Sequence, residues 1–194
     1  MLKNVKSSYF IKLMFAYINE RQKLKLVKYN KNLQKNIDIS IINYKFFSGK
    51  YIIYESNRSG KEYNGDYDRL IFEGEYLKGQ RSGKGKEYGL FNGKLSFEGE
   101  YLDGLRTGKG KEYYGDKLIF EGEYLNGKRT GKGKEYYGDK LIFEGEYLNG
   151  KRNGKGKEYY NGKLEFEGEY LNGKRHGKGK EYDYDGKLYL KVNI

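Results

Sequence analysis

The sequence contains no cysteine, no proline and no tryptophan, and it has a single histidine. Without cysteine there can be no disulfides, no cysteine zinc sites and no thiol chemistry. One histidine cannot by itself build a histidine metal cluster. Long apolar runs are missing too, because the stretch of residues 9–18 is too short to span a bilayer and contains Lys12. No signal peptide is recognised, so we expect a soluble cytoplasmic protein that needs no cofactor.

Apolar material is scarce over the 194 residues, with a mean hydropathy of -1.00. This composition leaves little for a thick core. Instead the chain has 17% aromatic residues, all of them Tyr or Phe, and 29 glycines. Such rings favour β-strands, and glycine favours tight turns. The composition therefore predicts an all-β fold in which aromatic rings supply the core.

One pattern returns along the chain and decides the architecture. Residues 72–88 read FEGEYLKGQRSGKGKEY, and close copies begin at Phe97, Phe120, Phe143 and Phe166. Residues 47–63 follow the same pattern in degenerate form, and Tyr189 begins a copy that stops after five more residues. Repeats at a fixed period of this length predict a stacked array with atypical ends, in which each unit buries its core against its neighbours.

Each copy holds two strand signals separated by a turn. In the third close copy Phe120, Gly122 and Tyr124 alternate with Glu121 and Glu123, so the rings and the carboxylates point to opposite faces. The turn follows at Asn-Gly in positions 126–127, and the second strand runs through residues 131–136. Further turn signals between copies complete a meander of antiparallel hairpins.

A glycine inside a strand needs a reason, because it normally weakens the strand. We expect Gly122 to leave a hole into which a ring from the neighbouring copy fits, so that the rings stack as two ladders. The ladder residues predicted in this way are Phe97, Gly99, Tyr101, Phe120, Gly122, Tyr124, Phe143, Gly145, Tyr147, Phe166, Gly168 and Tyr170.

The pattern Y/F-x-G-x-Y/W, followed by x-G-K-R-x-G-x-G, resembles the MORN repeat over residues 47–194. The resemblance implies an elongated, curved single sheet with a groove. It also implies a role in scaffolding, dimerisation or contact with phospholipid membranes. The first strand has Tyr where the family usually has Trp. We therefore expect two parts, a basic helical segment at 1–46 and a β-sheet array at 47–194.

The segment 1–46 differs in kind from the repeats. Apolar residues follow helical spacing in two groups, Ile11, Met14, Phe15 and Ile18, and then Leu26, Tyr29, Leu33 and Ile37. Two short helices are predicted, and they could cap the open first end of the sheet. Alternatively, residues 15–18 and 24–27 with Leu33 resemble an F-box, which would make the chain a ubiquitin-ligase substrate adaptor.

Charge is unevenly distributed between these parts. Ten Lys and Arg residues oppose two acidic residues in 1–46, a net charge of +8, which leaves +4 of the total +12 for the repeats. The basic excess does not follow a continuous face, so a nucleic-acid partner is not expected.

No catalytic constellation stands out. The run Gly127 to Lys134 superficially resembles a phosphate-binding loop, but the residue after the Lys is not Ser or Thr and the spacing is wrong. Glu121 and Glu123 recur identically in every copy, whereas acid–base catalysis needs environments that separate two pKa values. We expect them to pair across strands with Lys132 and Lys134. His176 occupies a position that is Thr130 in a sister copy, so it is interpreted as a turn residue.

Two rows of cations remain as candidate binding residues. They are Arg81, Arg106, Arg129, Arg152 and Arg175, and Lys84, Lys109, Lys132, Lys155 and Lys178. They could serve solubility and pairing with Glu, or they could meet anionic lipid headgroups or an acidic protein. Because neighbouring Glu residues dilute the field, a protein partner is favoured.

These observations favour a non-catalytic scaffold that binds a protein partner through the groove and its aromatic rows. The alternatives are a phosphoinositide-binding membrane module and the F-box-like adaptor, and we expect the protein in the cytoplasm, at membranes or at the cytoskeleton. The apolar strand of residues 189–194 could present unpaired backbone groups to a second copy, which predicts a homodimer. Lys191 and a terminal carboxylate could instead blunt this edge and leave a monomer.

Overall fold

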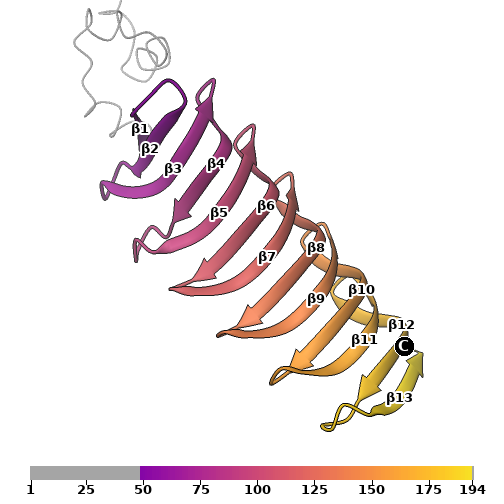
Figure 1. Cartoon of the computed structure of the whole chain (residues 1–194). Coiled ribbons are helices and arrows are strands. Elements are labelled where there is room, and N and C mark those ends of the chain that lie inside the picture. The colour runs from indigo at the N-terminus through magenta and orange to yellow at the C-terminus, as the bar shows by residue number, and fades with distance from the viewer. Residues whose placement is uncertain (1–48, 194) are drawn as a thin grey trace, which may run out of the picture. The chain divides into compact units, whose positions relative to one another are not determined.

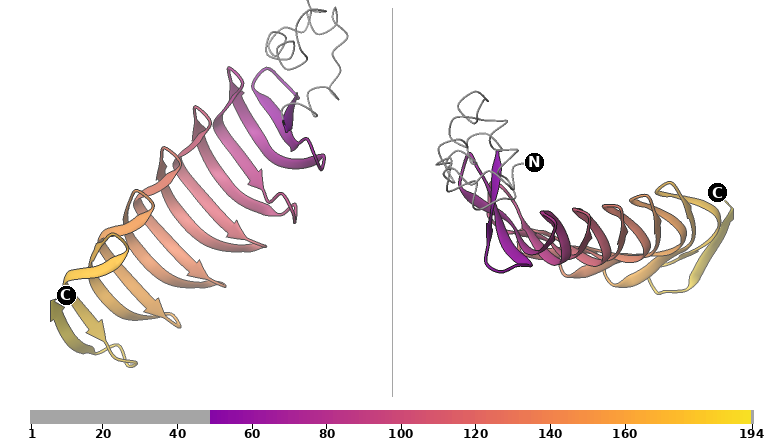
Figure 2. Two further views of the ribbon diagram at one scale, coloured as in Figure 1. Left: turned by 180° about the vertical axis from the view of Figure 1, so that it is seen from behind. Right: turned by 90° about the horizontal axis from the view of Figure 1, so that it is seen from above.

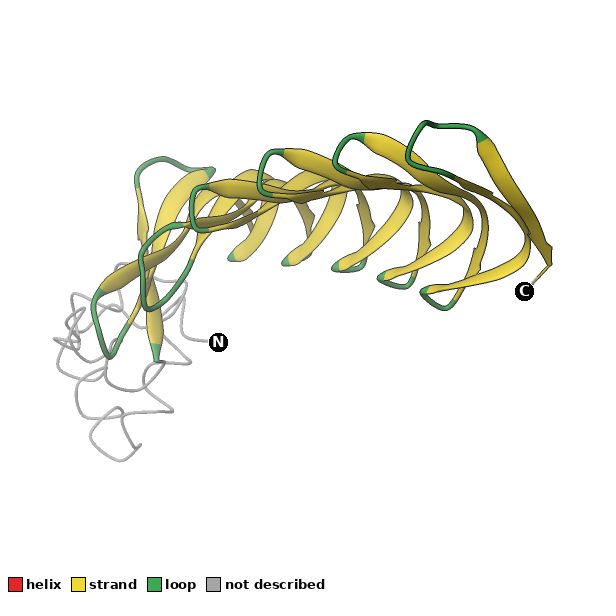
Figure 3. Cartoon of the chain, turned by 90° about the horizontal axis from the view of Figure 1, so that it is seen from below, coloured by secondary structure: helices red, strands yellow, loops and turns green. Residues whose placement is uncertain are grey.

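The computed structural model describes residues 49–193, and these residues form β-strands joined by turns (Figure 1, Figure 3). Within them, thirteen strands pair in sequence order as one antiparallel sheet. The strands are β1 (Lys50–Tyr54), β2 (Ser59–Asn64), β3 (Arg69–Leu77), β4 (Gln80–Tyr88), β5 (Leu95–Leu102), β6 (Leu105–Tyr114), β7 (Lys117–Leu125), β8 (Lys128–Tyr137), β9 (Lys140–Leu148), β10 (Lys151–Tyr160), β11 (Lys163–Leu171), β12 (Lys174–Tyr182) and β13 (Leu188–Asn193).

The predicted all-β meander of hairpins is therefore confirmed. The helices predicted for residues 1–46 lie outside the described residues. The described part divides into two compact units, residues 49–53 with 62–70 and residues 54–61 with 71–193. The second unit contains the five close copies, whose hairpins follow one another along the array (Figure 2).

The turn inside each copy has the geometry that its sequence demands. Asn126 and Gly127 have φ values of +50° and +78°, the positive pair of a two-residue hairpin turn whose twist suits the flanking strands. The same turn recurs in the other copies. Gly127 also donates its backbone N–H to the carbonyl of Arg106 at 2.9 Å, and the equivalent bond recurs at Gly104, Gly150 and Gly173. Each turn is therefore tied to the copy before it.

The core lies on one face of the sheet and is built from rings over paired glycines. Gly122 faces Gly133 on the next strand, and the ring of Phe120 covers both. A Cβ at Gly122 would lie 2.7 Å from Cζ of Phe120 and 2.8 Å from the carbonyl oxygen of Lys132. No side chain fits at Gly122. The ring of Phe120 therefore packs directly against the backbone of both strands and is completely buried.

The rings form one zigzag instead of the two separate ladders predicted. Phe120 makes edge-to-face contacts with Tyr124 of its own copy at 5.8 Å and with Tyr147 of the next copy at 5.2 Å. The predicted source of the filling ring was also wrong for Gly122, which is covered by Phe120 of its own strand. The ring from the next copy, Tyr147, contacts Gly133 instead. Phe120 is nearly perpendicular to both Tyr rings, at 88° and 83°, which is an arrangement that aromatic pairs prefer.

Candidate binding groove

The face opposite the rings forms one continuous groove across the second unit. Its floor is a row of paired glycines on successive strands: Gly74, Gly85, Gly99, Gly110, Gly122, Gly133, Gly145, Gly156, Gly168 and Gly179. Strand alternation explains the position, because the residues on either side of each glycine point away from the ring face. The floor therefore presents bare backbone to any occupant.

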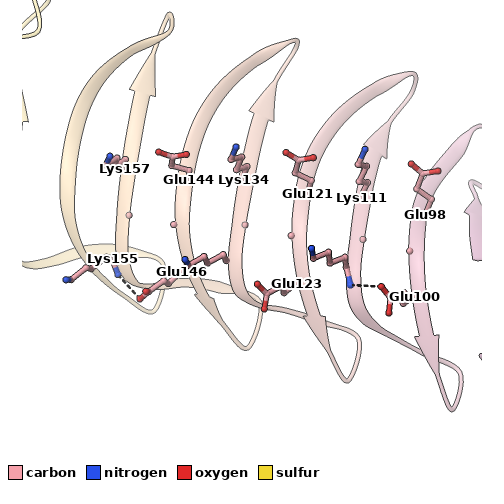
Figure 4. A pocket seen from close by; sticks show the side chains of 18 of the residues that line it. Glu98, Glu100, Lys111, Glu121, Glu123, Lys134, Glu144, Glu146, Lys155 and Lys157 are labelled. Carbon is pink, nitrogen blue, oxygen red and sulfur yellow. Dashed lines mark hydrogen bonds between the residues drawn. The ribbon is translucent and has the colours of Figure 1, made fainter. Parts of the chain in front are cut away.

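Two charged rows flank this floor (Figure 4). The first row consists of Glu73, Lys86, Glu98, Lys111, Glu121, Lys134, Glu144, Lys157, Glu167 and Lys180. The second row consists of Lys84, Glu100, Lys109, Glu123, Lys132, Glu146, Lys155, Glu169 and Lys178. Acid and base alternate from strand to strand in both rows, so neighbouring charges largely offset one another.

The first row follows the predicted pairing. Glu121 faces Lys134 on β8 and Lys111 on β6. The hydroxyl of Tyr136 donates a hydrogen bond to Glu121 at 2.6 Å. Burial of the ring and this bond to an anion raise the pKa of Tyr136 to about 12. The tyrosine side chains thus hold the glutamates of this row in place.

The second row departs from the prediction, because Glu123 does not face Lys132. It faces Thr130 on β8 and Lys109 on β6, whereas Lys132 faces Glu146 on β9. A bulge in β8 causes this shift, since Gly131 adopts a φ of +57° and extra residues enter the strand.

The carboxylates of the second row cover these bulges. The backbone N–H of Lys155 donates to Glu146 at 3.1 Å, and that of Lys84 donates to Glu75 at the same distance. The side chain of Glu123 lies against Gly131 in the same way. These glutamates therefore stabilise backbone geometry, a role that residue spacing alone did not indicate.

The predicted arginine row lies on the ring face and not in the groove. The guanidinium of Arg129 lies 3.9 Å from the centroid of Phe120, and its Nη2 is 2.6 Å from Glu112 of the preceding copy. Tyr124 donates a second hydrogen bond to Glu112 at 2.6 Å. Arg81, Arg106, Arg152 and Arg175 stack on their own phenylalanines in the same way.

This ion pair joins consecutive copies. Burial alone would raise the pKa of Glu112, but the hydrogen bonds from Arg129 and Tyr124 and the charge of Arg129 hold that pKa below its ordinary value. The spacing of residues in the sequence did not single out Glu112 or its equivalents Glu87, Glu135 and Glu158. The signal that could have identified these glutamates is their place at the end of each GKGKE run, because the strand register sets that residue opposite a phenylalanine.

The ten predicted cations are thus divided between two faces. The lysines line the groove, and the arginines cover the core. The ring rows expected at the contact surface are buried, with Phe120 at 0% and Tyr124 at 3% exposure. His176 is exposed and faces Glu169.

Among residues 49–193 there is no group of three or more metal-binding side chains that could hold a metal ion. Nor does this part of the chain contain a helix that is long and apolar enough to cross a bilayer.

Comparison with solved structures gives weak likenesses. The crystal structure of TarM is 14% identical with a TM-score of 0.35, covering 85% of this chain and 26% of that one. A Staphylococcus aureus TarM variant in complex with Fondaparinux, alpha-GlcNAc-glycerol and UDP is 15% identical with the same TM-score, covering 75% and 26%. The comparison with curated proteins gave no match.

The comparison with protein families gives a clear result. The MORN repeat model matches five consecutive segments, residues 72–94, 97–118, 120–141, 143–163 and 166–187. These segments span more than half of the sequence and coincide with the hairpins of β3 to β12. The chain therefore belongs to the MORN repeat family.

Proposed function

We propose that this chain is a non-catalytic scaffold that binds a segment of a protein partner in the groove. MORN repeats are consistent with a repeat-based role in binding or scaffolding. The observation that supports the proposal most directly is the continuity of the glycine floor over ten strands. A floor without side chains admits close approach of another chain along its whole length.

The repetition of the site favours binding over catalysis. Every copy presents the same glycines, glutamates and lysines, so no single position differs from its neighbours in the way a reaction centre does. An array of equal, weak contacts suits an extended partner whose affinity is the sum of many small terms.

The charge pattern favours a protein over an anionic membrane. Most groove lysines lie between glutamates of neighbouring strands, for example Lys134 between Glu121 and Glu144, whereas Lys180 on β12 lies between Glu167 and Lys191. A membrane surface attracts clustered cations, whereas a protein segment can present both signs of charge. Phosphoinositide binding stays as an alternative outcome of the test, and the F-box-like residues lie outside the described part.

The test uses affinity capture with the full chain and two matched triple variants. The groove variant replaces Lys111, Lys134 and Lys157 by Gln, and the control makes the same change at Lys117, Lys140 and Lys163, the first residues of β7, β9 and β11. We expect the groove variant to lose the captured partner while the control retains it. Equal capture by both variants would exclude the groove as the contact surface.

Flotation with vesicles tests the membrane alternative. Vesicles that contain phosphatidylserine or phosphoinositide are compared with neutral vesicles at low and high salt. Strong, salt-sensitive co-flotation that the groove substitutions abolish would favour the membrane module over the protein scaffold.

A further inference from the structure

A row of half-exposed leucines runs along the groove face beside the second charged row. Leu125 follows the buried Tyr124 on β7, so alternation places it on the same face as Glu121 and Glu123. It is the last residue before the turn, and its cross-strand partner is Lys128. We name the equivalent positions the ledge: Leu77, Gln80, Leu102, Leu105, Leu125, Lys128, Leu148, Lys151, Leu171 and Lys174.

The composition of the ledge changes along the array. On β5 to β7 it is purely apolar, with Leu102, Leu105 and Leu125 exposed by 50–58%. In the later hairpins the leucine faces an exposed lysine on the next strand. The pairs are Leu125 with Lys128, Leu148 with Lys151, and Leu171 with Lys174. Within residues 49–193, the side chains of these three lysines make no hydrogen bond and no ion pair. The ledge therefore has an apolar half and a half that adds unpaired positive charge.

The backbone behind the ledge is fixed. Four of the turns that end the ledge strands donate a hydrogen bond to the preceding copy, from Gly104, Gly127, Gly150 and Gly173. The leucines are thus presented at a regular interval on tied hairpin ends. Exposed apolar side chains in such a row are typical of a contact surface.

The direction in which the ledge runs limits the secondary structure that a partner can have when it binds there. The ledge crosses the strands, and their backbone groups are already paired within the sheet. A segment bound along the ledge therefore cannot add to the sheet, whereas an α-helix can lie there with its backbone hydrogen bonds already made. Neighbouring strands lie about 4.8 Å apart, so ledge leucines recur about every 9.6 Å. Seven residues of an α-helix advance about 10.5 Å, close to this interval.

The geometry points to the ledge as a docking surface for an acidic amphipathic α-helix of a protein partner. Its leucine-type stripe would lie on the ledge leucines, and its acidic residues would meet Lys128, Lys151 and Lys174. The ledge is apolar on β5 to β7 and carries its lysines on β8 to β12. The helix would therefore bind with its acidic end over β8 to β12. This inference rests on the proposed scaffold function and adds the chemistry of the partner.

The test measures binding of synthetic fluorescent peptides to the full chain by anisotropy. One peptide is a four-heptad helix with leucines on one stripe and glutamates beside it, a second has lysines in place of the glutamates, and a third scrambles the acidic sequence. The ledge variant carries Lys128→Glu, Lys151→Glu and Lys174→Glu. The matched control carries Lys117→Glu, Lys140→Glu and Lys163→Glu, which makes the same change of net charge at the other end of the hairpins, where β7, β9 and β11 begin.

We expect the acidic helix to bind more tightly than both other peptides. The ledge variant should weaken that binding about tenfold, and the control variant should weaken it less than about twofold. Leu102→Ser combined with Leu125→Ser should also weaken it while the thermal melt still shows a folded array.

Three results would overturn the inference. The first is that both charge-reversed variants weaken peptide binding equally. The second is that the acidic helix binds no more tightly than its scrambled form. The third is that no peptide binds, while phosphatidylserine vesicles bind the chain and the ledge variant abolishes that binding. The groove variant with Gln at residues 111, 134 and 157 separates this inference from the proposed function. Peptide binding that depends on those lysines and not on the ledge would exclude the ledge and leave the groove as the binding site.

Discussion

The paired glycines are the residues that tolerate least change. At Gly122 the surrounding atoms are the ring of Phe120 and the backbone of the neighbouring strand, and neither can move without breaking the sheet. The glutamate beside it points into the open groove and meets only side chains. Two adjacent residues of one strand therefore differ sharply in how strictly the fold constrains them.

We predict that Gly122→Val destabilises the array by more than about 3 kcal/mol, because overpacking against backbone cannot be relieved. Glu121→Gln keeps a hydrogen-bond acceptor for Tyr136 and should cost less than about 1 kcal/mol. Urea denaturation of both variants measures the difference. Equal midpoints would mean that the glycine floor does not support the ring zigzag.

The ion pair of Glu112 with Arg129 predicts a pH dependence. The folded-state pKa of Glu112 is lowered, so its contribution to stability is present above the unfolded pKa and is lost as the pH falls through the folded pKa. At about pH 7 we expect Glu112→Gln to cost about 1–3 kcal/mol, and this cost should vanish in acid. Urea denaturation across the pH range checks this. A cost that stays constant in acid would contradict the lowered pKa.

At the scale of the strand, alternation and the bulge have separate effects. Arg129 and Lys132 are three residues apart, so alternation places Arg129 on the core face and Lys132 in the groove. The bulge at Gly131, which has a positive φ, skips two residues and changes the cross-strand partner without changing the face. Glu123 therefore faces Thr130, and Lys132 faces Glu146 on the next strand.

We predict that Gly131→Ala costs more than Gly138→Ala. Both residues have positive φ, +57° and +63°, and both variants pay the cost of a left-handed backbone, about 1–2 kcal/mol. Only Gly131 also lies against the carboxylate of Glu123. Thermal or urea melts measure the excess, which should disappear in a Glu123→Ala background. An excess that persists there would show that Glu123 does not clamp the bulge.

At the scale of the whole molecule, stability is shared between neighbouring copies. The ring zigzag, the Arg–Glu pairs and the turn hydrogen bonds all join a copy to the adjacent ones. Such an array behaves as a chain of nearest-neighbour terms.

We therefore predict that deletion of residues 120–142, one complete copy, leaves a folded protein with a lower melting temperature. The cut joins residue 119 to Phe143 in the original register. Deletion of residues 120–141 is the control, because a one-residue shift moves rings and charges to the wrong faces. Circular dichroism melts of both proteins check the prediction. Cooperative melting of the control at the same temperature would contradict it.

We also predict a homodimer through β13. Within the described residues β13 pairs only with β12, and Leu188, Tyr189 and Leu190 are exposed by 47–74%. An open strand of this kind is a template for pairing with another chain. Light scattering at tens of micromolar should give a dimer mass for the full chain and a monomer mass after truncation at Lys187. A dimer that survives truncation would place the interface elsewhere.

The sequence by itself determined the features that depend on local chain geometry. The repeat period, the strand alternation around Gly122 and the Asn126–Gly127 turn could all be predicted, because φ preferences and two-residue alternation act within a few residues. The pairing of Glu121 with Lys134 followed from the same alternation.

Only the tertiary structure decided the features that depend on contacts between copies. The bulge shifted the partners of Glu123, and the pairing of successive strands stacked Arg129 on Phe120 and brought Glu112 to Arg129 of the next copy. The order of the hairpins set the leucines of the ledge beside the groove at intervals of two strands. These arrangements follow from the register of one strand against the next, which sequence spacing within a single copy does not contain.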